Sequence, residues 1–233
     1  MQIEICIENL HEAELANKYK CDRIEVCSAL DLGGLTPPYS LIQACAKIQG
    51  IDSHILIRPR AGNFMYKTEE LILMKEDIKI AAEAGAKGVV FGCLNSDNVI
   101  DISSCELLVR IAKDYHLETT FHRAIDFTSD YISSLKTIID LGFDRVLTSG
   151  QEEKALDGIE NIKTISNLFS GQIELMAGSG INEENINHFI EIDLNAVHFS
   201  LRKKNNLLAK YAMGLESTPD ESKLKTIIQK IRK

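Results

Sequence analysis

The sequence has few of the features that mark disordered, secreted or membrane-embedded chains. Proline occurs 4 times and glycine 14 times in 233 residues, and no residue type dominates, which excludes a long disordered segment. The N-terminus has no basic region followed by an apolar stretch, and no apolar run approaches membrane-spanning length. We therefore expect a cytoplasmic protein with no membrane partner.

Clustered positive charge and metal-type cysteine spacing are also lacking. The formal net charge is -8, and no basic stretch with interleaved aromatic residues offsets it, so nucleic acid is excluded as a partner. None of the six cysteines forms a Cys-x-x-Cys pair or a zinc-ribbon spacing. Most of them are expected to be small core residues, and no nucleotide cofactor is predicted.

Short runs of alternating apolar and polar residues recur along the whole chain. In the first run Ile3, Ile5 and Ile7 share one face, and Glu4 and Cys6 share the other. The expected strands cover 2–7, 22–27, 54–58, 88–91, the first part of 119–126, 145–148, 173–176 and 196–199. The expected helices cover about 9–19, 39–48, 68–84, 104–115, 131–141, 153–168, 183–191 and, with Thr218 as N-cap and Pro219 at the first helical position, a terminal stretch to 231.

Eight strands that alternate with helices predict a single-domain (β/α)8 TIM barrel over residues 1–233. The content of 45% hydrophobic residues is sufficient for such a core. A doubly wound sheet is the main alternative, but its central strands are usually apolar on both faces. The polar faces found here suit the inside of a barrel near its active end.

The stretch Thr119 to Asp126 is the strongest functional signal, because a β-branched and aromatic strand leads directly into His122 and Arg123. Functional groups of parallel barrels lie where strands pass into the following loops. Strand parity predicts that ten polar side chains point into the barrel: Glu4, Cys6, Glu8, Glu25, Cys27, Arg58, Arg60, His122, His198 and Ser200. So many ionisable groups must either pair with one another or face a wet cavity.

Two interpretations of this interior remain open. In the first, Glu4, Glu25 and Arg58 form a structural ion-pair network. In the second, a small anionic metabolite, phosphorylated or carboxylated, is held by an arginine clamp, and the catalytic residues are Glu25, Arg58, His122 and Asp126. The residues expected to bind the substrate are Glu4, Arg60, Arg123, Ser149, Gly150, Gly178, Ser179, Gly180 and His198. The glycine-rich segments among them offer backbone N–H groups, and Asp126 is expected to orient His122 or Arg123.

A metal interpretation draws on Cys6, Cys27, His122 and His198, since thiolate and imidazole suit Cu(I) or zinc. Spacing gives this interpretation no support, because the four residues lie on different strands. A buried inward cysteine is more often a packed thiol, and that alternative stays open.

Seven short motifs follow one another along the chain: Glu4-Ile5-Cys6, Asp22-Arg23-Ile24-Glu25-Val26-Cys27, Gly33-Gly34-Leu35-Thr36-Pro37, Ile57-Arg58-Pro59-Arg60, Phe121-His122-Arg123-Ala124-Ile125-Asp126, Leu147-Thr148-Ser149-Gly150 and Met176-Ala177-Gly178-Ser179-Gly180. As a set, these motifs resemble the CutC copper homeostasis family. The chain departs from the family pattern at Ala61 to Asn63, where relatives usually carry Gly-Gly-Asp.

The resemblance implies a TIM barrel, a cytoplasmic location, a homo-oligomer and a role in copper handling. It also implies that Cys6 and Cys27, which lie in these motifs, act as copper ligands. It attaches no reaction to the chain, so whether the protein is an enzyme stays open. The expected ligand is Cu(I) or a small anion.

Overall fold

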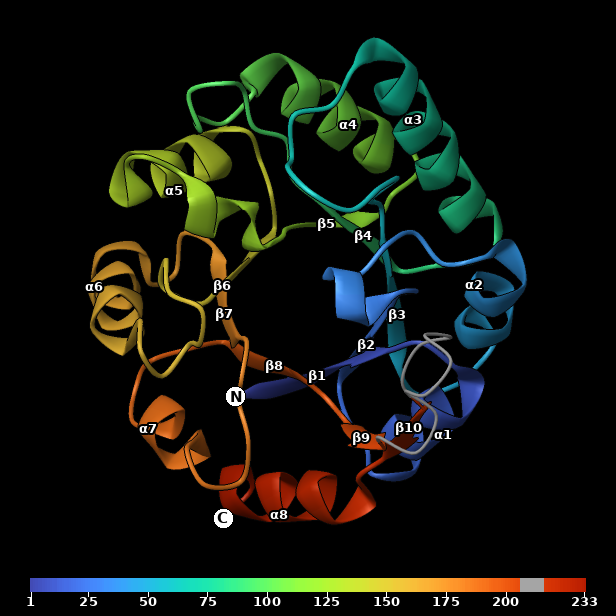
Figure 1. Cartoon of the computed structure of the whole chain (residues 1–233), viewed down its shortest axis with the longest axis vertical. Helices are drawn as coiled ribbons and strands as arrows, with labels where there is room; N and C mark the ends of the chain where they lie inside the picture. Colours follow the sequence, from blue (N-terminus) through green and yellow to red (C-terminus); the bar gives the residue numbers. More distant parts are fainter. Residues whose placement is uncertain (206–215) are drawn as a thin grey trace.

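The strands form a closed parallel barrel, as a computed structural model shows for residues 1–205 and 216–233 (Figure 1). They are β1 (Gln2–Ile7), β2 (Arg23–Val26), β3 (Asp52–Leu56), β4 (Gly88–Phe91), β5 (Glu118–Phe121), β6 (Arg145–Thr148), β7 (Glu174–Gly178) and β8 (Ala196–Ser200). Each strand pairs with the next, and β8 pairs with β1, which closes the ring. The predicted (β/α)8 TIM barrel is therefore confirmed.

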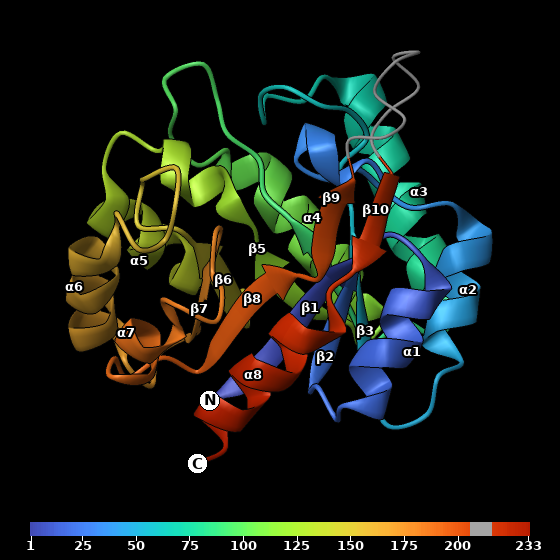
Figure 2. The ribbon, with the colours of Figure 1, turned by 60° about the horizontal axis from the view of Figure 1, so that its bottom comes forward.

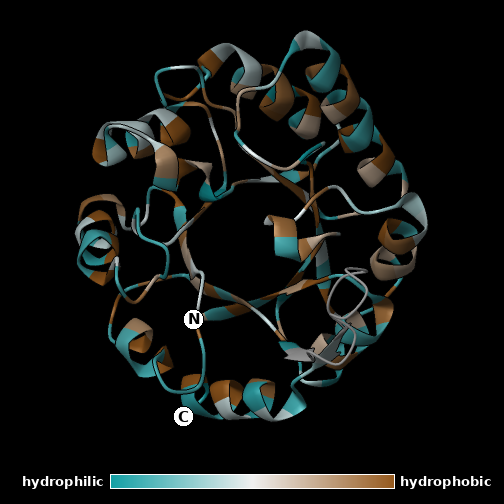
Figure 3. Ribbon diagram, in the orientation of Figure 1, coloured by the Kyte–Doolittle hydropathy of each residue, from teal (hydrophilic) through white to brown (hydrophobic). Residues whose placement is uncertain are grey.

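Helices form an outer ring around these strands and turn their apolar faces toward them (Figure 3). They are α1 (Leu10–Lys18), α2 (Tyr39–Ala46), α3 (Thr68–Glu83), α4 (Ile102–Asp114), α5 (Tyr131–Asp140), α6 (Ile159–Phe169), α7 (Ile186–Ile190) and α8 (Glu221–Ile231), with 3-10 turns at Leu30–Leu32 and Arg123–Phe127. Asn9 caps the first helix, because its Oδ1 accepts a hydrogen bond from the Glu12 backbone N at 3.0 Å. Among the described residues, no helix is both long enough and apolar enough to cross a bilayer.

Alternation along the strands separates two environments. Ile3, Ile5 and Ile7 are fully buried in the main hydrophobic core, which lies between the barrel and its helices. Glu4 and Cys6 point into the barrel and are also buried. All six cysteines are buried and free, as expected for core residues.

The segment before α8 differs from the sequence prediction. β9 (Arg202–Asn205) and β10 (Glu216–Pro219) form an antiparallel hairpin that joins β8 to α8 (Figure 2). Thr218 is therefore not the N-cap and Pro219 is not helical; Asp220 caps the helix by accepting from the Lys223 backbone N at 3.0 Å. Proline tolerates the end of an edge strand because its missing N–H is not needed there.

Two further helices start later than predicted. Residues 151–158 form turns, and α6 begins only at Ile159, because Ala155 N donates to Ser179 O at 3.0 Å and ties this segment to the end of β7. α7 begins at Ile186 because Asn182 Oδ1 accepts from Glu184 N at 2.9 Å, which forms an Asx turn in place of the first helical turn.

Candidate functional site

A cavity of about 400 Å³ opens at the carboxyl ends of the strands. Glu25, Arg58 and His122, which lie far apart in the sequence, all line it together with Cys6 and His198. The structure therefore brings together the three residues on which the sequence interpretation depended. This end of a parallel barrel is where active sites are built.

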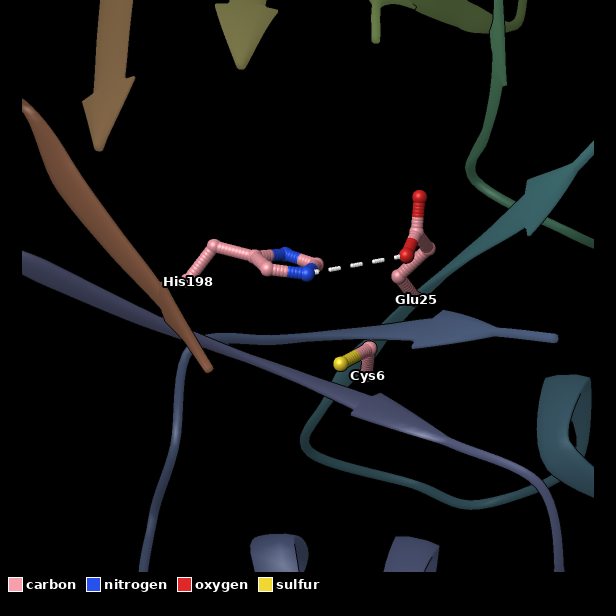
Figure 4. Close-up of side chains that lie close together, drawn as sticks. All are labelled: Cys6, Glu25 and His198. Carbon is pink, nitrogen blue, oxygen red and sulfur yellow. Dashed lines mark ion pairs between the residues drawn. The ribbon is translucent and has the colours of Figure 1, made fainter. Parts of the chain in front are cut away.

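The floor of the cavity holds Cys6 from β1, Glu25 from β2 and His198 from β8 (Figure 4). The thiol, one carboxylate oxygen and one imidazole nitrogen all lie within 4.8 Å of one another, and all three residues are buried. Strand register explains the grouping, since Cys6 is paired with Glu25 on one side and with Ser200 on the other. His198 Nε2 lies 3.7 Å from Glu25 Oε2.

Glu4 supports His198 from below. His198 Nδ1 and Glu4 Oε1 are 2.7 Å apart, and Arg23 donates to the other oxygen of the same carboxylate. Burial alone would raise the pKa of Glu4, but Arg23 and His198 lower it well below its usual value. Burial alone would lower the pKa of His198, but Cys6, Glu4 and Glu25 raise it well above 6.5. This interaction favours a protonated His198 beside an ionised Glu4.

Glu25 and Cys27 form a second contact at the floor. Cys27 Sγ lies 3.2 Å from Glu25 Oε2, and the Cys27 side chain is fully buried behind the cavity wall. Burial raises the pKa of Glu25, and burial and the adjacent carboxylate raise the pKa of the Cys27 thiol. Burial thus favours the protonated form of Glu25, in contrast to Glu4, whose pKa is lowered.

Arg58 is a buried cation that donates hydrogen bonds to three backbone carbonyls. Its guanidinium donates to Leu32 O at 3.0 Å, Gly34 O at 2.7 Å and Gly62 O at 2.9 Å. The side chain is only 5% exposed, and its Nε has no hydrogen-bond partner. Within residues 1–205 and 216–233, no carboxylate forms an ion pair with it. This leaves a positive charge uncompensated at the cavity wall.

His122 lies beside Arg58 with one nitrogen unused. Its Nδ1 accepts from Ala124 N at 3.3 Å, so the neutral ring carries its proton on Nε2. That Nε2 has no partner among the described residues, although the side chain is 95% buried. Burial and the Arg58 charge lower the pKa of His122 to about 3. His122 therefore presents a neutral N–H donor at neutral pH.

Asp126 positions Arg123 and makes no contact with His122. Arg123 Nε donates to Asp126 Oδ2 at 2.9 Å, and Arg123 Nη2 donates to Ser149 Oγ at 2.6 Å. The carboxylate also accepts from Thr148 Oγ1 at 2.5 Å and from the Ser149 backbone N. Arg123 lines the cavity, whereas Asp126, Thr148 and Ser149 do not.

Arg60 does not join Arg58 in a clamp. Its guanidinium forms an ion pair with Glu70 and donates to Asn63 O at 3.1 Å and Met65 O at 2.6 Å, so it closes its own loop and does not line the cavity. Asn63 Oδ1 also accepts from Arg60 Nη2 at 3.1 Å, so the residue that departs from the family pattern helps to hold this arginine. The arginine clamp predicted from the sequence is not formed.

The two glycine-rich segments have different roles. Ser179 and Gly180 line the cavity after β7. Gly150 does not line it; its φ is +72°, and a Cβ there would lie 2.2 Å from Gly158 O. Gly178 leaves room for the floor, because a Cβ would lie 2.6 Å from the Leu147 side chain and 3.2 Å from His198.

A structural ion-pair network does exist inside the barrel, with different members from those expected. We call it the lower network, since it lies near the amino ends of the strands; its members are Glu4, Arg23, Glu118, Arg145 and Glu174. Glu174 connects the two arginines, at 3.1 Å from Arg23 and 2.7 Å from Arg145. Glu25 and Arg58 are outside it, so only Glu4 belongs to both the predicted and the observed network.

Sequence reasoning missed Lys223 and Arg202 at the cavity. Lys223 of α8 donates from Nζ to Ser200 O at 2.9 Å and lies over the Phe199 ring at 5.4 Å. Arg202 pairs with Asp31 at 2.9 Å. Lys223 is one of several basic residues on α8, and the contact with β8, which forms only on folding, distinguishes it from its neighbours.

Comparison with known proteins gives one family. The model of the CutC family matches residues 1–203. A relative from Glaesserella parasuis serovar 5, called "family protein CutC", is 43% identical over 209 residues, which covers 89% of this chain and 85% of the relative. A relative from Caenorhabditis elegans, called "Copper homeostasis protein cutC homolog", is 41% identical over 220 residues, which covers 92% of this chain and 86% of the relative.

A solved structure of a CutC protein from Streptococcus agalactiae superimposes with a TM-score of 0.80 at 34% identity, and the match covers 85% of this chain and 98% of that chain. The CutC-like sequence motifs and the barrel fold both agree with these matches. This protein belongs to the CutC family.

Proposed function

We propose that the cavity binds a small anionic metabolite and transfers protons on it. The observation that carries this proposal is Arg58, a buried guanidinium with three carbonyl partners and no carboxylate among the described residues. A buried charge without a counter-charge is costly, and a bound anion removes that cost. Arg58 and His122 both line the cavity, and each has one buried N–H, at Nε and at Nε2, that has no partner among the described residues.

Proton transfer belongs to the floor of the cavity. Burial favours the protonated form of Glu25, which makes it a candidate general acid. His198 lies 3.7 Å from it and is held by Glu4, so the two groups can exchange a proton with a ligand above them. Pairs of titratable groups with displaced pKa values are typical of sites that perform acid–base chemistry.

The anion site can be tested by thermal shift with a panel of phosphorylated and carboxylated metabolites. Binding should raise the melting temperature of the wild type. Arg58→Gln should lose this shift, whereas Arg60→Gln, which removes an arginine outside the cavity, should retain it. Arg58→Lys serves as a folding control that keeps the charge. The absence of any shift across the panel, or equal shifts in wild type and Arg58→Gln, would contradict the proposal.

Cu(I) binding is a second candidate, because one specific observation favours it. Cys6 and His198 provide a thiol and an imidazole within 4.8 Å of each other, and these are donors that Cu(I) prefers. Glu25 is a harder third ligand, and Cys27 is the nearest further thiol, 3.2 Å from Glu25. The name of the Caenorhabditis elegans relative supports a role of this chain in copper homeostasis.

The copper site can be tested by titrating reduced protein with Cu(I) against a competing chelator. Wild type should bind one Cu(I) per chain, and Cys6→Ser should abolish this binding. Cys27→Ser tests the thiol behind the wall, and Cys45→Ser on α2 is the matched control. Unchanged binding in Cys6→Ser would remove this cluster as the site.

A further inference from the structure

A second positive group, Lys223, lines the same cavity at another part of the wall. Lys223 is anchored on β8 through Ser200 and Phe199, whereas Arg58 follows β3, and β1 and β2 lie between β8 and β3 in the ring. The Lys223 ammonium has three N–H groups. Among the described residues, it donates one hydrogen bond, to Ser200 O. Burial lowers the pKa of Lys223, which reflects the cost of a charge held away from water.

Two backbone amides lie on the same part of the wall as Lys223. Gly180 and Ile181 follow β7, the neighbour of β8, and both line the cavity. Neither amide N–H donates to an acceptor within the described ranges. We call Lys223 with these two amides the Lys223 group, and Arg58 with His122 the Arg58 group. Each group combines a cation with unused N–H donors, which is the arrangement that binds an anionic oxygen cluster.

The remaining charged side chains of the wall are already paired. Arg123 is bound to Asp126 at 2.9 Å, and Arg202 is bound to Asp31 at 2.9 Å. Among the described arginine and lysine side chains that line the cavity, Arg58 and Lys223 are therefore the two that form no ion pair. The buried floor of Cys6, Glu25 and His198 lies on β1, β2 and β8.

Apolar side chains also line the cavity. Leu56, Phe64, Leu147 and Phe199 line it, and the Phe64 ring lies 5.2 Å from the Arg58 guanidinium. Such apolar side chains favour contact with the carbon atoms of a ligand over contact with a further charged group.

We propose that the ligand carries an anionic group at each end of a short carbon chain, with one end held by the Arg58 group and the other by the Lys223 group. This inference rests on the proposed anion site and adds a second point of attachment to it. The carbon chain of such a ligand lies over the floor that holds Glu25 and His198. Two fixed ends would orient the reacting carbon relative to these groups.

The inference is tested by calorimetric titration with two matched series of acids. Succinate, glutarate and adipate carry two carboxylates, and butyrate, valerate and hexanoate carry one. The best dicarboxylate should bind at least about tenfold more tightly than its matched monocarboxylate, as expected for one added charged contact. Lys223→Met should remove this difference, and Lys223→Arg should preserve it. Lys225→Met is the control, because Lys225 is exposed on the same helix.

Each other outcome has a definite meaning. If both series bind equally and Lys223→Met changes nothing while Arg58→Gln weakens both, the second attachment is wrong and the anion site stands. If Lys225→Met removes the difference as well, the gain is non-specific and the inference is wrong. If no acid binds, or Arg58→Gln leaves both series unchanged, the anion site and the inference both fail.

Discussion

Substitution of Glu4 by glutamine tests how the cavity floor depends on the lower network. Glu4 contacts both the network and the floor, since it accepts from Arg23 and lies 2.7 Å from His198 Nδ1. Removing one partner of a buried ion pair costs about 3–5 kcal/mol, because the other charge is left buried. Arg23 keeps a contact with Glu174 at 3.1 Å and with Gln2 at 3.1 Å, which places the expected loss near the lower limit.

We therefore expect Glu4→Gln to lower the free energy of unfolding by about 3 kcal/mol. For a chain of this size that corresponds to a fall in melting temperature of about 6–12 °C. Urea unfolding followed by circular dichroism measures the change directly. Glu76→Gln, which breaks an exposed pair with Lys79, is the control and should leave the unfolding midpoint unchanged. A loss below about 1 kcal/mol for Glu4→Gln would refute the reasoning, because it would mean that the buried pair contributes no more than a surface pair.

Three further predictions concern pH, a turn and a loop. The pKa of His122 is about 3 in the folded chain and about 6.5 in the unfolded chain, so between these values only the unfolded chain binds the proton. The free energy of unfolding of the wild type should therefore fall as the pH is lowered from 6.5, by up to about 1.4 kcal/mol per pH unit more than that of His122→Gln. Urea midpoints that change in parallel with pH in both proteins would contradict this. Gly150→Ala should be less stable than Gly142→Ala in thermal melts, since both glycines have positive φ but only the first added Cβ meets a backbone oxygen, at 2.2 Å; equal losses would exclude the steric cause. Asp126→Asn should lower stability by about 1–3 kcal/mol by leaving Arg123 without its charged partner, whereas a loss below 0.5 kcal/mol in urea unfolding would show that the loop does not depend on this pair.

The fold was predictable because one signal repeats eight times. Each strand alternates in the same sense, so that the parity of Ile3, Ile5 and Ile7 already separates the helix side from the barrel interior. The same parity correctly grouped Glu25, Arg58 and His122 at the cavity. It failed for Arg60, which lies further beyond the end of β3 at Leu56 than Arg58 does, so that the loop decides the direction of its side chain.

The features missed by sequence reasoning depend on contacts between distant segments. Lys223 belongs to the site only because α8 packs where its ammonium reaches Ser200 O, 23 residues earlier in the chain. The β9–β10 hairpin depends on pairing between Arg202 and Pro219, and no local propensity indicates that contact. The lower network was missed for a different reason. The candidate residues were chosen mainly near the carboxyl ends of the strands, whereas Arg23 and Arg145 lie at the amino ends of β2 and β6.

The lower network also makes the case for a ligand stronger. Arg23 and Arg145 are as deeply buried as Arg58, and each of them has carboxylate partners, at 3.1 Å and 2.7 Å from Glu174. This barrel therefore compensates its buried guanidinium groups with protein carboxylates where the interior is closed. At the open end, Arg58 donates to three carbonyls and forms no ion pair with a carboxylate among the described residues. The carboxylate partner that the other two buried arginines have is therefore absent at the place where a soluble anion can enter. A protein carboxylate at that place would neutralise the cation permanently and compete with any anionic ligand, so its absence is what a binding site for an anion requires.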